Sequence, residues 1–454
     1  MSHDSDAFVF FGATGDLAHK KIFPSLHALV RRGALKVPVI GVAKAGWGLD
    51  DLKQRAHDSI ADHDDAFHEL LSLLRYVDGD YADPETFAAL KRELGDAKRP
   101  LHYLAIPPSL FATVVEALQS AGCADGARVV VEKPFGHDLA SATRLNEVLH
   151  AVFPESSIFR IDHYLGKEPV ENLVYTRFAN TFLEPLLRRE HVHHVQITMA
   201  ESFGVQGRGR FYEEAGAIRD VVQNHLLQVL ALTGMDPPAE HGNEAMRDEK
   251  VRFMRSLRTL TPQDVVRGQF VGYRDEEGVS EHSTVETFVA VRLRVDSWRW
   301  AGVPFLIRAG KQLPVTATEV IVQLTEPPQR VFDKGTPNRL RFQIGPDLRI
   351  SLDVRAKTPG EGMTGCDESL VLDERPRDEM EPYERLLGDA MKGDQQLFAR
   401  EDTVEAAWRI VDGILGDATP IHFYEPGSWG PPEADHLLPR GAKWLSPQLP
   451  GDQA

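Results

Sequence analysis

The chain has little cysteine and no long apolar run. Only Cys123 and Cys366 occur among its 454 residues, so neither a disulfide framework nor a cysteine-rich metal site is available, and we predict no metal site. No apolar segment approaches the length that spans a membrane, and residues 1–7 lack the basic start and the apolar stretch of a signal peptide. These features favour a cytoplasmic protein that does not bind membranes.

Basic residues are also in deficit. The chain has 51 lysines and arginines against 68 aspartates and glutamates, which gives a formal net charge of −17. A protein this acidic is a poor partner for nucleic acid or for an anionic membrane surface. If it binds anionic ligands, it must gather its few cations locally.

No repeat, low-complexity tract or Gly/Ser linker divides the chain, yet 454 residues are too many for one ordinary core. Up to about Asp162, apolar strands alternate with helical segments, which predicts a parallel, doubly wound sheet of the Rossmann type. Beyond it, apolar and polar residues alternate with a period of two, which predicts a mainly antiparallel sheet with one solvent-facing side and helices on the other. We therefore expect an α/β domain over residues 1–162 and a larger α+β domain over residues 163–454.

The pattern also gives individual elements. Strands are expected over residues 7–11, 37–43, 101–106 and 128–131, and the alternating segments are 195–199, 289–295 and 348–354. One helix is expected over residues 17–32, with a kink at Pro24 and an end at Gly33. Apolar residues at helical spacing predict a second helix over residues 213–233.

The first expected strand runs directly into Gly12-Ala13-Thr14-Gly15-Asp16-Leu17. Glycines between a strand and a helix allow the backbone to approach a pyrophosphate at the start of the helix. Gly-x-x-Gly is common in ordinary tight turns, so the spacing alone is weak evidence; the strand before it and the helix after it favour a dinucleotide site. Lys20 and Lys21 lie early in that helix, where a bound anion would offset their opposition to the helix dipole.

The end of the second expected strand indicates which coenzyme binds. NAD-specific enzymes usually place an acid there to hold the ribose 2′-hydroxyl. Here the strand ends Gly41-Val42-Ala43-Lys44, and no acid occurs before Asp50. A cation suits a 2′-phosphate, which favours NADP. Lysine is a point charge without the fork of arginine, so NAD stays open as a secondary coenzyme.

The densest polar constellation of the chain is Arg160-Ile161-Asp162-His163-Tyr164-Leu165-Gly166-Lys167-Glu168. It supplies one orienting acid and several donors for an anion. This segment is similar to the signature of glucose-6-phosphate dehydrogenases. Further motifs resemble that family in the same order along the chain: residues 12–21, 103–108 (YLAIPP), 132–136 (EKPFG), 218–225 (IRDVVQNH), 303–311 and 427–431 (GSWGP).

The resemblance implies oxidation of glucose 6-phosphate at C1 to 6-phosphogluconolactone with hydride transfer to NADP, the first step of the oxidative pentose phosphate pathway. It implies that His225 is the general base and Asp162 its orienting partner. The substrate-binding residues that it implies are Lys133, His163, Tyr164, Lys167, Glu201, Asp220 and Lys311. The coenzyme-binding residues that it implies are Gly12, Ala13, Thr14, Gly15, Asp16, Leu17, Lys21, Lys44, Tyr103 and Lys133. It also implies a homodimer or homotetramer that assembles through the face of a β-sheet.

The implied roles fit the chemistry. A proton must leave the C1 hydroxyl as hydride moves to the nicotinamide, and histidine, with an ordinary pKa of about 6.5, is often neutral near pH 7 and can accept it. A carboxylate on the other ring nitrogen fixes the tautomer and stabilises the imidazolium that forms. Cations near the phosphate would account for local positive charge in an acidic chain.

The sequence departs from the family pattern at two places and leaves two alternatives. Thr316 stands where relatives often carry a second basic residue, and Lys44 replaces a common arginine. One alternative is a sugar dehydrogenase that acts on an unphosphorylated sugar, which would leave residues 162–167 without a clear purpose. The other is a non-catalytic NADPH-binding regulator, which would have no need for Asp162 and His225.

Overall fold

The computed structural model describes residues 4–329, 331–332, 335–360, 362–373 and 380–447. The chain divides into two compact units. The first unit comprises Met1–Glu168, His241–Arg247 and Glu379–Glu405, and the second comprises Pro169–Glu240, Asp248–Asp378 and Ala406–Ala454. The predicted boundary at Asp162 lies close to the first change of unit, whereas two later segments of the chain return to the first unit.

The first unit contains a parallel six-stranded sheet in the order β3-β2-β1-β4-β5-β6. Its strands are β1 (Ala7–Phe11), β2 (Val39–Ala43), β3 (Leu74–Asp78), β4 (Pro100–Leu104), β5 (Arg128–Glu132) and β6 (Ile158–Ile161). This is the strand order of the dinucleotide-binding Rossmann fold, in which ligands bind outside the carboxyl ends of the strands. The predicted doubly wound sheet is confirmed.

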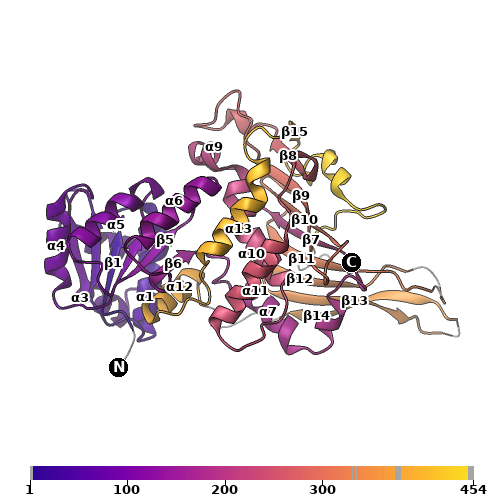
Figure 1. The fold of residues 1–454 in the computed structure, drawn as a ribbon, viewed down its shortest axis with the longest axis horizontal. Coiled ribbons are helices and arrows are strands. Elements are labelled where there is room, and N and C mark those ends of the chain that lie inside the picture. The colour runs from indigo at the N-terminus through magenta and orange to yellow at the C-terminus, as the bar shows by residue number, and fades with distance from the viewer. Residues whose placement is uncertain (1–3, 330, 333–334, 361, 374–379, 448–454) are drawn as a thin grey trace. The chain divides into compact units, whose positions relative to one another are not determined.

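Helices of the first unit pack on this sheet. They are η1 (Ala18–Ile22), α1 (Phe23–Arg31), α2 (Leu49–Ser59), α3 (Asp65–Leu73), α4 (Pro84–Leu94), α5 (Phe111–Ser120), α6 (Leu139–His150) and α12 (Pro382–Lys392), with short 3₁₀ turns η2 (Pro108–Leu110) and η3 (Glu155–Ser157). The helix predicted over residues 17–32 is confirmed as η1 and α1; η1 is a π-helix, and the change to α-helix falls beside Pro24. Figure 1 shows α12, from the late part of the chain, beside α1, and both share one apolar core with the sheet.

The second unit contains a nine-stranded mixed sheet in the order β14-β13-β12-β11-β7-β10-β9-β8-β15 (Figure 1). Its strands are β7 (Val192–Ala200), β8 (Val265–Phe270), β9 (Phe288–Arg294), β10 (Pro304–Gly310), β11 (Ala317–Leu324), β12 (Arg339–Gly345), β13 (Arg349–Lys357), β14 (Gly365–Asp373) and β15 (Ile421–Tyr424). Only the β7–β10 and β8–β15 pairs are parallel. The predicted mainly antiparallel sheet is confirmed.

Helices of the second unit lie before, between and after the strands of this sheet along the chain. They are α8 (Leu183–Leu186), α9 (Gly209–Ala217), η4 (Ile218–Leu226) and α10 (Leu227–Gly234), with 3₁₀ turns η5 (Pro262–Asp264), η6 (Tyr273–Asp275), η7 (Asp412–Ile414) and η8 (Pro432–Leu437). The residues of three further helices are divided between the two units: α7 (Glu168–Ala179), α11 (Asn243–Ser256) and α13 (Glu401–Val411). Within the described residues, no helix is both long and apolar enough to cross a membrane.

The expectation that one side of the large sheet faces solvent is wrong at its central strands. Two polar residues of the central strands, Gln196 of β7 and Arg308 of β10, are buried, whereas Arg294 of β9 is exposed. The side chain of Gln196 donates to the carbonyl of Lys443 (2.7 Å) and accepts from the N–H of Leu445 (2.8 Å), while Arg308 donates to the carbonyl of Leu445 (2.8 Å). The C-terminal segment therefore covers the polar side of the central strands, and hydrogen bonds replace the water that the pattern predicted.

Candidate functional site

The glycine-rich turn after β1 has the geometry of a backbone cradle. Gly12 has φ of +81°, and the Gly15 N–H donates to the Gly12 carbonyl (2.9 Å). A β-carbon on Gly12 would lie 2.2 Å from the carbonyl oxygen of Ala105, just beyond β4. Only glycine fits this conformation and this close approach. The turn therefore packs closely against the carboxyl end of the sheet, the edge at which a dinucleotide binds in folds of this type.

Residues of η1 follow this turn. Lys20 forms an exposed ion pair with Asp16 (3.2 Å), one turn earlier. Lys21 is exposed and, together with Lys20, lines a cavity of about 190 Å³. Both lysines therefore line the cavity, but only Lys20 is paired with the Asp16 carboxylate.

Acidic residues from β3 lie at the end of β2, where the sequence pattern shows none before Asp50. The carboxylate of Asp78 accepts from the N–H groups of Ala45 (3.0 Å) and Gly46 (2.9 Å), which lowers its pKa. Lys44 forms an exposed ion pair with Asp80 (2.7 Å). An acid therefore lies beside the end of β2 in the structure, supplied by the neighbouring parallel strand, although the sequence of β2 itself contains none.

The end of β5 carries a buried carboxyl group. Glu132 is buried and accepts a hydrogen bond from the hydroxyl of Tyr103, which lies wholly inside β4. Burial raises the pKa of Glu132 to about 7, against the opposing effects of Tyr103, Tyr383 and Lys133. Lys133 follows directly, half-buried, and its peptide bond to Pro134 is cis. Lys133 is therefore the more accessible of the two predicted ligand residues at this strand end. Tyr103 is buried, and its side chain contacts Glu132.

The loop after β6 gathers the residues predicted to hold the phosphate. Asp162 is buried, and its carboxylate accepts from the Tyr164 N–H (3.0 Å). The rings of His163 and Tyr164 lie 5.3 Å apart, and the Lys167 ammonium lies 3.8 Å from the centre of the Tyr164 ring. A tight turn, with Leu165 N–H bonded to the Asp162 carbonyl (2.9 Å), makes this possible. An imidazole, a phenol and an ammonium therefore share one small loop.

In the second unit, adjacent strands place Glu201 beside Lys311. Ala200 and Gly310 are partners in the parallel β7–β10 pair, and the residues that follow them form an ion pair of 2.7 Å. Lys311 is buried, 5.0 Å from the centre of the Tyr212 ring. Hydrogen bonds between the two strand ends fix the pair, since the Glu201 N–H donates to the Gly310 carbonyl (3.0 Å).

The helix predicted as continuous over residues 213–233 is interrupted, and that prediction is wrong in this respect. α9 is broken at Gly216, which has φ of +62°, and η4 then runs as a π-helix before α10 begins. Glu286 fixes the break: its carboxylate accepts from the Ile218 N–H (3.1 Å), and it would lie 2.5 Å from a β-carbon on Gly216. π-helical turns are frequent at functional sites.

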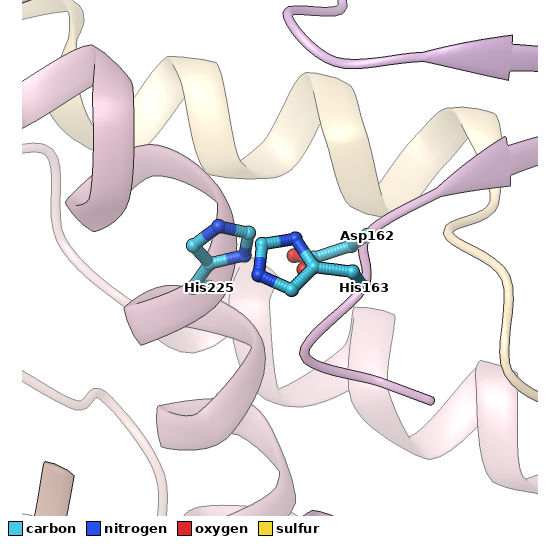
Figure 2. Close-up of side chains that lie close together, drawn as sticks. All are labelled: Asp162, His163 and His225. Carbon is cyan, nitrogen blue, oxygen red and sulfur yellow. The ribbon is translucent and has the colours of Figure 1, made fainter. Parts of the chain in front are cut away.

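η4 carries the two predicted residues Asp220 and His225. His225 is buried, with 2% of its surface exposed, and Asp220 is half-buried. Figure 2 shows His225 on this helix, and Asp162 and His163 on the loop that follows β6. His225 belongs to the second unit and Asp162 to the first.

Sequence comparison adds independent findings. Residues 9–172 match the family described as glucose-6-phosphate dehydrogenase, NAD binding domain, and residues 174–445 match its C-terminal domain. Glucose-6-phosphate 1-dehydrogenase 1 of Mycobacterium bovis is 46% identical over 98% of this chain and 97% of its own length. The chain belongs to the glucose-6-phosphate dehydrogenase family.

Solved structures of glucose-6-phosphate dehydrogenases agree with this assignment. A crystal structure of glucose-6-phosphate 1-dehydrogenase from Mycobacterium avium matches with a TM-score of 0.93 and 46% identity, over 99% of this chain and 100% of the other. A glucose-6-phosphate dehydrogenase in complex with its substrate glucose 6-phosphate matches with a TM-score of 0.92 and 36% identity, over 98% and 100% of the two chains. The predicted family is confirmed, and both parts of the chain are covered.

Two features of this chain were not evident from its motifs. Tyr212 is buried between charged groups: burial raises its pKa, and the charges of Asp220 and Glu201 raise it further. Thr316 accepts a hydrogen bond from the Ser202 N–H (3.0 Å), and its hydroxyl lies 2.8 Å from that of Ser202. The position that often carries a second basic residue in relatives is thus occupied here by a short, hydrogen-bonded pair next to Glu201.

Proposed function

We propose that this chain oxidises glucose 6-phosphate at C1 to 6-phosphogluconolactone, with NADP as the hydride acceptor. Family membership supports the reaction, as does the substrate complex of the relative that is 36% identical. The observation that carries the proposal is the loop after β6, which gathers His163, Tyr164 and Lys167 at the carboxyl end of the dinucleotide-binding sheet. This is the edge at which ligands of such sheets bind.

The phosphate of the substrate is held by this loop. His163, Tyr164 and Lys167 offer an imidazole, a phenol and an ammonium, which are suitable donors for an anion. Glu201, Lys311 and Asp220 of the second unit bind sugar hydroxyls, and their ion pair and shared neighbour Tyr212 hold them in place. Lys133 contacts substrate and coenzyme from the end of β5.

The proton of the C1 hydroxyl goes to His225. His225 is buried on η4, and the carboxylate of Asp162 orients the ring and stabilises the imidazolium. The Tyr164 N–H already holds one oxygen of that carboxylate. The coenzyme, when bound, supplies the nicotinamide that takes the hydride, and the protein supplies position.

The residues at the turn after β1 fit a dinucleotide. Gly12, Ala13, Thr14, Gly15, Asp16 and Leu17 form the cradle, and a β-carbon on Gly12 would displace it by clashing with the Ala105 carbonyl. Lys21 lies on the adjoining helix, and Lys44 faces the 2′-phosphate. Tyr103 acts on the coenzyme site indirectly, because its hydroxyl donates a hydrogen bond to Glu132.

Steady-state kinetics with glucose 6-phosphate and with free glucose test the reaction. Three donors at the phosphate loop should favour the phosphorylated sugar by at least about 100-fold in kcat/KM, since each hydrogen bond to a charged group contributes roughly tenfold or more. A preference for free glucose would refute the proposal in favour of a dehydrogenase of unphosphorylated sugars. Coenzyme binding without any turnover would instead favour the non-catalytic regulator.

Coenzyme preference rests on Lys44, whose partner Asp80 competes with a 2′-phosphate. We expect Lys44→Ala to lower kcat/KM for NADP about tenfold and to change that for NAD much less. The matched variant Asp80→Asn, which removes the competing charge, should improve NADP use by a few-fold. Both effects should shrink at high salt because the pair is exposed. Equal losses with both coenzymes after Lys44→Ala would show that Lys44 does not recognise the 2′-phosphate.

The protein assembles as a homodimer or homotetramer through its large sheet. β14 is an edge strand of that sheet, and Leu370, Val371 and Leu372 in it are 62%, 40% and 47% exposed. Exposed apolar side chains on the face of a sheet are suited to pack against another chain. Light scattering should give the mass of two or four chains, and Leu370→Glu with Leu372→Glu should reduce it. A monomeric wild-type protein at micromolar concentration would contradict this assembly.

A further inference from the structure

Helix α12 places a tyrosine from the late part of the chain inside the first unit. Leu386, Leu387 and Ala390 of α12 are fully buried in the core shared with α1 and the parallel sheet. At its first turn, Glu384 forms an ion pair with Arg32, just after α1 (2.5 Å). α12 is therefore fixed at both its apolar face and its start, and Tyr383, in that first turn, has a defined position.

Tyr383 contacts three elements that carry predicted ligand residues. Its phenol interacts with the carboxylate of Glu132, at the end of β5, and favours the ionised form of that carboxylate. Its ring lies 6.3 Å from that of His163, with the two planes 12° apart. It also lines the cavity of about 190 Å³ that Lys20 and Lys21 line from η1. One side chain thus lies near the β5 end and the β6 loop and shares a cavity with the helix after the glycine turn.

Glu132 is the acceptor at the centre of this arrangement. The hydroxyl of Tyr103 donates to its carboxylate, and the phenol of Tyr383 and the backbone N–H of Lys133 also favour the ionised carboxylate. The nearby Lys133 charge favours the ionised carboxylate, while burial opposes it. A buried carboxylate with so few donors depends strongly on each of them. Loss of one phenol would therefore disturb the group that adjoins Lys133.

We propose that Tyr383 is a positioning residue for the substrate site and that it acts through the carboxylate of Glu132. Tyr383 fixes the position of Lys133 relative to His163. The distance between these two predicted substrate ligands, which follow different strands, therefore stays constant. The inference rests on the proposed function, because it assigns Lys133 and His163 to the same substrate. Neither Tyr383 nor Glu132 needs to touch the sugar phosphate for this role.

Kinetics of Tyr383→Phe with glucose 6-phosphate test the proposal. Because Lys133 and His163 hold the substrate before and during reaction, KM should rise about tenfold while kcat changes less than about threefold. Tyr103→Phe, which withdraws the other phenol from the same carboxylate, should raise KM in the same way. Tyr273→Phe is the matched control, since Tyr273 is also a buried phenol bonded to a carboxylate, that of Glu213 (2.8 Å). That variant should keep the wild-type KM.

A double-mutant cycle separates action through Glu132 from a merely structural effect. In a Glu132→Gln background, Tyr383→Phe should raise KM by less than about twofold, because the shared acceptor has already been altered. A full additional tenfold rise, or an unchanged KM in both Tyr383→Phe and Tyr103→Phe, would overturn the proposal. If the wild-type protein does not turn over glucose 6-phosphate, the proposed function fails and not the role of Tyr383. Thermal unfolding of each variant shows whether the proteins being compared are folded.

Discussion

Replacement of His225 by asparagine is expected to lower kcat by about 10²–10⁴-fold and to leave NADPH binding unchanged. Asparagine cannot accept the proton of the C1 hydroxyl, and a general base typically contributes a factor of this size. Fluorescence titration with NADPH and steady-state kinetics with glucose 6-phosphate measure the two properties separately. The matched control is His194→Asn, since His194 is a buried imidazole on β7 of the same unit that hydrogen-bonds to Gln196 (3.0 Å). That variant should keep kcat within a few-fold.

The proposed pairing of His225 with Asp162 is tested by the double variant. If the two groups act as one unit, Asp162→Asn should also slow turnover strongly, and the double variant should be no slower than His225→Asn alone. Independent, multiplying losses in the double variant would show that Asp162 acts elsewhere. An unchanged kcat in His225→Asn would refute its assignment as the base.

The second large effect is expected at the glycine turn. Gly12→Ala should weaken NADPH binding at least about 100-fold, because its β-carbon would meet the Ala105 carbonyl and displace the turn by a substantial fraction of an ångström or more. The same clash should lower the unfolding temperature, since backbone atoms on both sides must move. Fluorescence titration and thermal unfolding measure these effects.

A second glycine separates the clash from the cost of the backbone conformation. Gly122 also has a positive φ, +65°, but a β-carbon there would meet nothing within 4 Å. Gly122→Ala should therefore show only a modest loss of stability, about 1–2 kcal/mol, and normal coenzyme binding. If Gly12→Ala behaved in the same way, the close approach of the turn to β4 would have no role in binding.

The first unit could be predicted largely from sequence because its signals are local. The apolar strand before Gly12, the glycine turn and the helix after it lie within about one βα unit, and Gly33 marks the helix end with φ of +69°. β3 was not predicted, since only two of its five residues, Leu74 and Val77, are buried and its pattern is therefore weak. The acids that β3 brings to Lys44 were missed for the same reason.

The remaining differences come from long-range packing. Tyr383 is far along the chain from Glu132 and His163, and nothing in its local pattern shows that α12 returns to the first unit. The buried polar side of the large sheet depends on Lys443 and Leu445, which a period of two cannot reveal. The break at Gly216 did have a signal, since a glycine inside a helical pattern weakens it, but only Glu286 explains its position.

The central claim is that one imidazole accepts the C1 proton while one carboxylate orients it. A crystal structure of the wild-type protein with glucose 6-phosphate tests this most directly. We expect the C1 hydroxyl oxygen at about 2.6–3.2 Å from one ring nitrogen of His225 and the Asp162 carboxylate on the other. A C1 hydroxyl bound to a different base, with His225 turned away from the sugar, would contradict the account.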